Sequence, residues 1–133
     1  MTEKKKVRGK NKKQQKKKDP RKLEILDACY ALGKACGFVG DFDDAKRYYK
    51  RAKEGYEEQL GRDSEKAHEV TRSLIIGAGM SEGERSQNLR DLVKMMERAL
   101  GEENVVTLHT LSTLGEELRQ NGQYEEAIKV HER

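Results

Sequence analysis

One block of this 133-residue sequence occurs twice, and its two copies lie 82 residues apart. The copies cover residues 32–45 and 114–127. In each, the glycine of a Leu-Gly pair lies seven residues before a loop glycine, an aromatic residue follows two positions after that loop glycine, and an alanine five positions after it. Because 82 is two periods of about 41 residues, the spacing predicts a repeat protein with a degenerate middle copy.

Each period has the pattern of two amphipathic helices. Asp19 can cap a helix that begins at Pro20, and Gly37 and Gly40 end it. Asp41 then caps a second helix that runs to about Leu60-Gly61, with Asp44 in the capping-box position. The spacing predicts one apolar stripe on each helix: Ile25, Cys29, Leu32 and Cys36 on the first, and Ala45, Tyr49, Ala52 and Tyr56 on the second.

The middle copy is the least regular. Residues 89–99 mirror residues 42–52 at an offset of 47, which places Met95-Met96 where Tyr48-Tyr49 stands, as core gap-fillers. Its first helix is expected around residues 71–78. The glycine-rich stretch 77–83 lacks the spacing of a phosphate-binding loop, so we interpret it as a turn.

These patterns predict an all-α fold, an α-solenoid of antiparallel helix pairs with about three repeats, the middle one degenerate and the last incomplete. The repeat domain covers residues 21–133, with repeats at about 22–61, 64–100 and 104–133. Gly33 and Gly115 are expected to let neighbouring helices approach closely. Small residues at Ala45, Ala52, Ala99 and Ala127 are expected at the crossings within helix pairs.

The pattern Leu32-Gly33, Gly40-Asp41-Phe42-Asp43-Asp44-Ala45, Tyr49, Ala52 resembles a tetratricopeptide repeat. The longer period and the Leu-Gly links at residues 60–61 and 100–101 look like the kinesin-light-chain type. The resemblance implies that the first helix of each pair lines a concave face on which partners bind. Mapped onto this chain, that face would consist of Asp27, Tyr30, Lys34, Glu69, Arg72, Ile76, His109, Ser112, Glu116 and Arg119.

The chain departs from the kinesin-light-chain type in two respects. Its links at residues 63–65 and 103–105 contain no proline. The positions of that type's ligand-clamping asparagine pair hold Tyr30-Ala31, Arg72-Ser73 and Ser112-Thr113. We therefore do not transfer that clamp. The sequence stops in the first half of the last helix, so we expect an incomplete array, or one completed by another chain.

Charge is divided unevenly along the chain. The 28 Lys and Arg residues and 24 Asp and Glu residues leave a net charge of +4, yet residues 1–22 alone hold twelve Lys or Arg against two acidic residues. Residues 23–133 are therefore acidic. We expect residues 1–20 to form a disordered basic arm, with clusters at Lys4, Lys5, Lys6, Arg8, Lys16, Lys17 and Lys18. Three interpretations of the arm stay open: a nuclear-import signal, an arm that binds phosphate or another acidic surface, and a solubilising tail without a dedicated partner.

Motifs of catalysis or metal binding are missing from the sequence. His68, His109 and His131 fall on different predicted helices without ligand spacing, and His131 takes the position of Tyr49. Cys29 and Cys36 lie on an apolar stripe, as small core residues do. We expect no enzyme activity, no cofactor and no bound metal.

Two functions remain open. The first is a protein–protein interaction module or scaffold in the cytoplasm that binds a partner peptide or protein on its concave face. The resemblance implies a place in a kinesin-light-chain-like adaptor as one form of this function. The second is a nucleic-acid-associated or nuclear factor, whose basic arm binds RNA or DNA phosphate, or another acidic surface, while the repeats recruit protein. Apolar runs of at most five residues, far short of the roughly 20 needed to cross a bilayer, predict no membrane span. The sequence does not indicate an oligomeric state.

Overall fold

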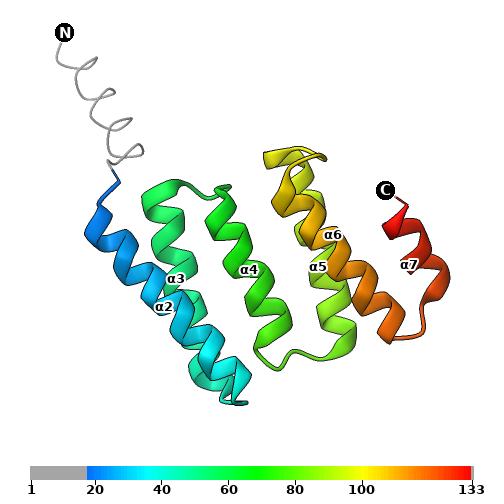
Figure 1. The fold of residues 1–133 in the computed structure, drawn as a ribbon, viewed down its shortest axis with the longest axis horizontal. Coiled ribbons are helices and arrows are strands. Elements are labelled where there is room, and N and C mark those ends of the chain that lie inside the picture. Colours follow the sequence, from blue (N-terminus) through cyan, green and yellow to red (C-terminus); the bar gives the residue numbers. More distant parts are fainter. Residues whose placement is uncertain (1–17, 133) are drawn as a thin grey trace, which may run out of the picture.

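The computed structural model describes residues 18–132, which form helices and short links without any strand. The helices follow one another as antiparallel neighbours (Figure 1). Their bounds are α2 Pro20–Phe38, α3 Phe42–Leu60, α4 Glu65–Gly77, α5 Glu82–Leu100, α6 Val105–Gln120 and α7 Tyr124–His131. The predicted all-α solenoid of helix pairs is confirmed.

Polar side chains begin most of these helices. Asp19 accepts a hydrogen bond from the backbone N–H of Arg21, with Pro20 at the first helical position. Asp41 accepts from Asp44 N–H at the start of α3, and Ser64 from Ala67 N–H at the start of α4. Each cap satisfies a backbone donor that the first helical turn leaves unpaired. The expected caps at Asp19 and Asp41 are thus present.

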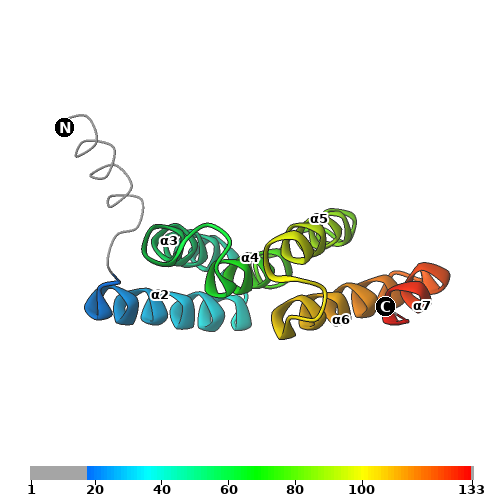
Figure 2. The same ribbon diagram turned by 90° about the horizontal axis from the view of Figure 1, so that it is seen from above.

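The helices lie in two layers with one helix set between them. Figure 2 shows α3 and α5 on one side of the array and α2 and α6 on the other, with α4 in between. On the side of α2 and α6, α4 is therefore set back. This is the side formed by the first helix of each pair, which was expected to be concave.

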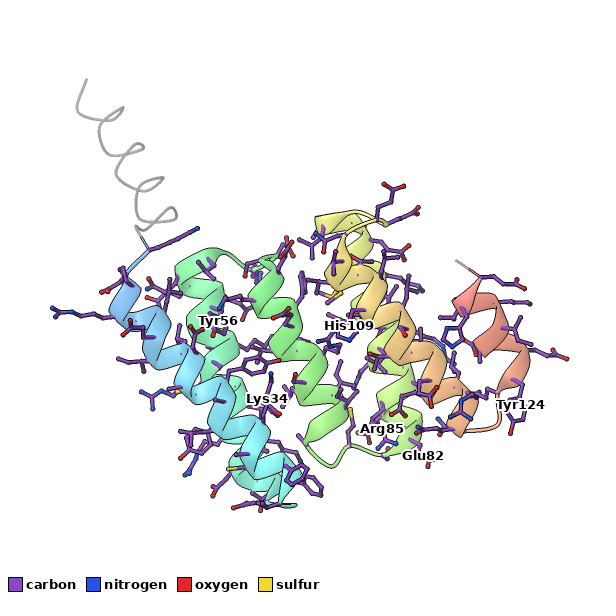
Figure 3. All side chains as sticks on the ribbon, in the orientation of Figure 1. Lys34, Tyr56, Glu82, Arg85, His109 and Tyr124 are labelled. Carbon is purple, nitrogen blue, oxygen red and sulfur yellow. The ribbon has the colours of Figure 1, made fainter. Side chains whose placement is uncertain are left out.

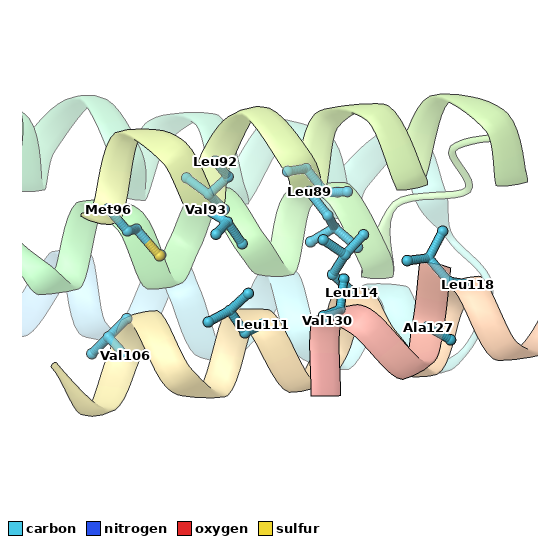
Figure 4. Close-up of a cluster of buried hydrophobic side chains, with 11 residues drawn as sticks. Leu89, Leu92, Val93, Met96, Val106, Leu111, Leu114, Leu118, Ala127 and Val130 are labelled. Atoms are coloured by element: carbon cyan, nitrogen blue, oxygen red, sulfur yellow. The ribbon is translucent and has the colours of Figure 1, made fainter. Parts of the chain in front are cut away.

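The hydrophobic core consists of two clusters. One lies among α2, α3 and α4 around Tyr49 and Tyr56, and the other lies among α5, α6 and α7 around Leu89 and Leu118. Figure 4 shows side chains of α5 and α6 facing each other in the second cluster. Ile75 is the α4 residue that joins this second cluster. The core is therefore divided at the middle repeat, where α4 contributes residues to both clusters.

Two glycines allow close helix contacts, as predicted. A Cβ on Gly33 would lie 2.7 Å from the Tyr49 ring, and a Cβ on Gly115 would lie 2.5 Å from the His131 ring. Since Tyr49 and His131 are themselves 82 residues apart, the outer repeats share this contact. The helix-packing role expected of His131 is confirmed, although this residue is exposed.

The predicted stripe on α2 is partly wrong. Cys29 is buried, but Ile25 and Leu32 are 53% and 47% exposed. The buried residues of α2 are instead Leu26, Cys29 and Gly33, which face α3. Ile25 and Leu32 lie on a face against which no described helix packs.

The register predicted for the middle repeat is also wrong. Helix α5 ends at Leu100-Gly101 as α3 ends at Leu60-Gly61, an offset of 40, and both glycines have a positive φ of 91° and 101°. Met96 is fully buried as expected, but at the position of Tyr56, while Met95 is 46% exposed. Ala99 is exposed rather than at a helix crossing. Helix α4 begins at Glu65, ahead of the expected residues 71–78.

The predicted basic arm lies almost wholly outside the described residues. Of its seven named Lys and Arg residues, Lys18 alone is described, and it is exposed. The predicted turn at residues 77–83 is present as the α4–α5 link, which occupies residues 78–81. None of the described helices combines the length and the apolar character needed to cross a membrane.

Candidate functional site

The concave side carries two recesses between α2 and α4, which together we call the α2–α4 groove. The Asp27 recess has a volume of about 180 Å³ and is lined by Asp27, Tyr30, Tyr56, Lys66 and Glu69. The Ile76 recess has a volume of about 360 Å³ and is lined by Lys34, Gly37, Phe38, Tyr49, Ser73, Ile76 and Gly77. Five of the ten predicted partner-binding residues thus line one groove: Asp27, Tyr30, Lys34, Glu69 and Ile76.

Asp27 is the hydrogen-bond centre of its recess. Its Oδ1 accepts a hydrogen bond from the Tyr56 hydroxyl and another from Lys66 Nζ at 3.1 Å. Its Oδ2 accepts no hydrogen bond from the part of the chain that the structure describes. Glu69 likewise makes no ion pair among these residues. The recess therefore presents two carboxylate groups with free acceptor capacity beside the Lys66 ammonium.

The protonation states in this recess are well separated. The hydrogen bond from Tyr56 and the contact with Lys66 lower the pKa of Asp27, so the carboxylate is ionised at neutral pH. Burial, followed by the adjacent Asp27 carboxylate, raises the pKa of Tyr56, so its hydroxyl keeps its proton. The pair acts as a fixed donor and acceptor rather than as a proton-transfer site near pH 7.

Tyr30 joins the two recesses. Its hydroxyl shares a hydrogen bond of 2.7 Å with Ser73 Oγ on α4, and its ring lies 5.9 Å from the Tyr49 ring. Lys34 Nζ lies 4.3 Å from the centre of the Tyr30 ring, a cation–π distance. Figure 3 shows Tyr56 and Lys34 on the α2–α4 side of the array, at different heights along the groove.

The other five predicted residues do not join this groove. Arg72 of α4 is half-buried, and its buried Nη1 has no hydrogen-bond partner in the part of the chain that the structure describes. Those on α6 are exposed, and Arg119 Nε pairs with Glu116 at 3.1 Å. Figure 3 places His109 beside α6, away from the α2–α4 groove. The four α6 residues, His109, Ser112, Glu116 and Arg119, line none of the recesses between α2 and α4.

Three residues that hydrogen-bond to the predicted groove residues were missed by sequence reasoning. Tyr56 was assigned to the apolar stripe of α3, and its ring is indeed buried, but its hydroxyl reaches Asp27. Lys66 and Ser73 lie on α4, in the repeat whose predicted register is wrong. The signal for Tyr56 was available, because the hydroxyl of a buried tyrosine usually finds a polar partner.

The described residues contain no group of three or more His, Cys, Asp or Glu side chains that could hold a metal ion. His68 is buried beside Asp63, and Cys29 is a buried free thiol. The groove itself offers carboxylates, ammonium groups, a hydroxyl and aromatic rings. These groups can bind and orient a ligand by hydrogen bonds, charge and apolar contact.

Two family models of the tetratricopeptide repeat match the chain, one over residues 26–54 and the other over residues 107–133. The chain carries tetratricopeptide repeats. The two matches fall on the first and third helix pairs, and both leave out α4 and α5, where the spacing is irregular. No curated protein matches the chain significantly. Tetratricopeptide repeats support a role in protein–protein interaction and imply protein partners.

Proposed function

We propose that this tetratricopeptide-repeat domain binds a peptide segment of a partner protein in the α2–α4 groove. The observation that carries the proposal is the clustering of five of the ten predicted residues around two recesses between α2 and α4. Within residues 18–132, Asp27 Oδ1 accepts from Tyr56 and Lys66, which leaves its other oxygen available to a ligand. In the Asp27 recess, the Tyr56 hydroxyl and Lys66 Nζ both donate to Asp27, and the Tyr30 hydroxyl is bonded to Ser73, so these groups are held in place. Preorganised polar groups of this kind bind a ligand at low entropic cost.

The groove indicates the chemistry of the peptide. Asp27 and Glu69 suit a basic side chain or backbone N–H groups at one end of the segment. At the other end, Phe38 and Ile76 are 93% and 43% exposed and suit an apolar side chain. Tyr30, with Lys34 above its ring, lies between them and suits an aromatic or acidic side chain. The proposed ligand is therefore an extended segment with a basic residue and an apolar residue separated by several positions.

The proposal can be tested with peptides selected from a random library on the full chain. Affinities of the selected peptides are then measured for the wild type and for Lys34→Glu and Ile76→Glu. Both side chains are exposed, so the variants are expected to fold. We expect each to weaken binding about tenfold or more, which corresponds to roughly 1.4 kcal/mol. Lys50→Glu is the matched control, because Lys50 is exposed on α3 outside the groove.

Unchanged affinity in both groove variants would contradict the proposal, and so would an equal loss in the Lys50→Glu control. Circular dichroism of each variant separates loss of binding from loss of fold. Tyr30→Phe adds a finer test, since it removes the hydroxyl that contacts Ser73 while keeping the ring. If the ring is the anchor, this variant retains most of the affinity.

Two finer interpretations of the sequence stay predictions. One is a place in a kinesin-light-chain-like adaptor, which the long repeat period suggested. The other is phosphate binding by the twelve Lys and Arg residues among residues 1–22. If the basic residues bind phosphate, the chain should bind a single-stranded RNA with an affinity that falls steeply with salt. Removal of residues 1–18 should then abolish this binding.

A further inference from the structure

An apolar face of α2 is open where its counterpart on α6 is covered. Leu32 and Leu114 are equivalent at the offset of 82, yet Leu32 is 47% exposed and Leu114 is 3% exposed. Leu114 is buried because α5, the second helix of the preceding repeat, packs on this face of α6 (Figure 4). The face of α2 is therefore built for a neighbouring second helix.

The link after α2 has the same geometry as the link after α6. Gly40 and Gly122 have φ of 85° and 80°, and Asp41 N–H and Gln123 N–H each donate to a carbonyl five residues earlier at 2.8 Å. Val39 is thus the counterpart of Asn121. Asn121 Nδ2 donates a 3.1 Å hydrogen bond to Ser86 of α5, whereas Val39 is 76% exposed.

The opposite end of the array, α7, offers the complementary side chains. Ser86 is the fifth residue of α5, and the fifth residue of α7 is Ile128, which is 57% exposed. Phe42, the first residue of α3, packs against Gly79 in the following link. The first residue of α7 is Tyr124, which is 62% exposed and lies at the outer end of the array (Figure 3).

From these equivalences we infer that α7 of one molecule packs against α2 of a second copy, head to tail. In this contact Ile128 of the first copy meets Val39 of the second copy, as Ser86 meets Asn121 within one chain. Tyr124 of the first copy covers the link between α2 and α3 of the second. An apolar pair replaces a hydrogen-bonded pair, which suits an interface between separate molecules. Charge is complementary as well, since residues 102–132 hold seven Glu against two Lys or Arg, and residues 18–22 hold three Lys or Arg against one Asp.

The short α7 limits what is covered. Its residues 124–131 are equivalent to residues 82–89 of α5, which lie beside the second half of α6. The contact therefore includes Leu32 and Val39 but leaves Ile25, at the beginning of α2, outside. Such a small interface predicts weak association. A head-to-tail contact also uses different surfaces on the two copies, so it does not close at a dimer.

Sedimentation equilibrium on the full chain tests this inference, from micromolar to millimolar concentrations. We expect the average mass to rise beyond that of a dimer. Leu32→Glu and Ile128→Glu should each weaken association about tenfold or more, since each places a charge in an apolar contact. Ile25→Glu is the matched control, because Ile25 is equally exposed on the same face and should have no effect.

Mixing the two variants gives the sharpest outcome. Leu32→Glu leaves the α7 end intact and Ile128→Glu leaves the α2 end intact, so an equal mixture should form a one-to-one dimer that neither variant forms alone. A wild type that stays monomeric throughout would overturn the inference. So would a mixture that does not associate while the wild type does, or an Ile25→Glu variant as impaired as Leu32→Glu. These outcomes do not depend on peptide binding in the groove.

Discussion

The first helices of the outer repeats, α2 and α6, are similar in sequence pattern and different in environment. Both contribute a glycine to a close contact with the second helix of their own pair, through Gly33 and Gly115. They differ on the face that meets the preceding repeat, where Leu114 and Thr107 are buried while Leu32 and Ile25 are half-exposed. The apolar pattern therefore marks which residues can face a neighbour, and burial depends on whether that neighbour is present.

The largest effect expected from this difference is on stability. Leu114→Ala should lower the free energy of unfolding by about 3 kcal/mol, because it leaves a cavity between α5 and α6. Leu32→Ala should lower it by less than about 1 kcal/mol, because half of that side chain is already in water. Urea denaturation at low protein concentration measures both. Equal losses would mean that the two faces are equally covered.

The close contacts of the two glycines should also respond differently. In Gly33→Ala the new methyl group meets the ring of Tyr49, which is 3% exposed and fixed in the core, so we expect a loss of about 2 kcal/mol. In Gly115→Ala the methyl group meets His131, which is exposed at the end of α7 and can move. The higher helix propensity of alanine, up to about 1 kcal/mol, then offsets the clash. Thermal melts of the two variants measure both changes in stability. A larger loss of stability in Gly115→Ala than in Gly33→Ala would contradict this prediction.

A buried hydroxyl gives a smaller effect of opposite sign. Thr107 is fully buried, and its Oγ1 has no hydrogen-bond partner among residues 18–132. Thr107→Val should stabilise the protein by about 1 kcal/mol, because it removes an unpaired polar group without changing the shape. Ile25→Thr, at the equivalent position of α2, should change stability by less than about 0.5 kcal/mol. A destabilised Thr107→Val variant would show that this hydroxyl has a partner, such as a water molecule.

The smallest expected effect is a pH dependence from His68. Burial lowers the pKa of this imidazole below its usual value, outweighing the nearby Asp63 and Glu57, which raise it, while Lys53 acts with burial. The unfolded chain therefore binds the proton first, and stability should fall as the pH drops below about 6.5. The free energy of unfolding of the wild type should decrease more on acidification than that of His68→Gln. His109→Gln is the exposed control and should follow the wild type.

The outer repeats could be predicted from sequence because their signals are local. The Leu-Gly spacing, the loop glycines and the Asp caps each act within a few residues, and the structure confirms Asp19, Asp41, Gly33 and Gly115 in their expected roles. The middle repeat lacks these signals. Its register is set by the end of α5 at Leu100-Gly101, and a local similarity to residues 42–52 was misleading.

The groove was predictable only in part, for a physical reason. Helical periodicity places Asp27, Tyr30 and Lys34 on one face of α2 without reference to any other helix. The hydrogen-bond partners of Asp27 and Tyr30 are Tyr56, Lys66 and Ser73, which lie 29 to 43 positions away along the chain. Their contacts depend on how α3 and α4 pack, and the error in the middle register hid two of the three.

The central claim is that partner peptides bind in the α2–α4 groove. The most direct test is to add a library-selected peptide to the full ¹⁵N-labelled chain and to map the changes in the amide spectrum. We predict that the largest shifts fall on α2 and α4, near Asp27, Tyr30 and Ser73. Shifts concentrated on the exposed side of α3, at Lys46, Arg47 and Lys50, with α2 and α4 unaffected, would contradict the claim.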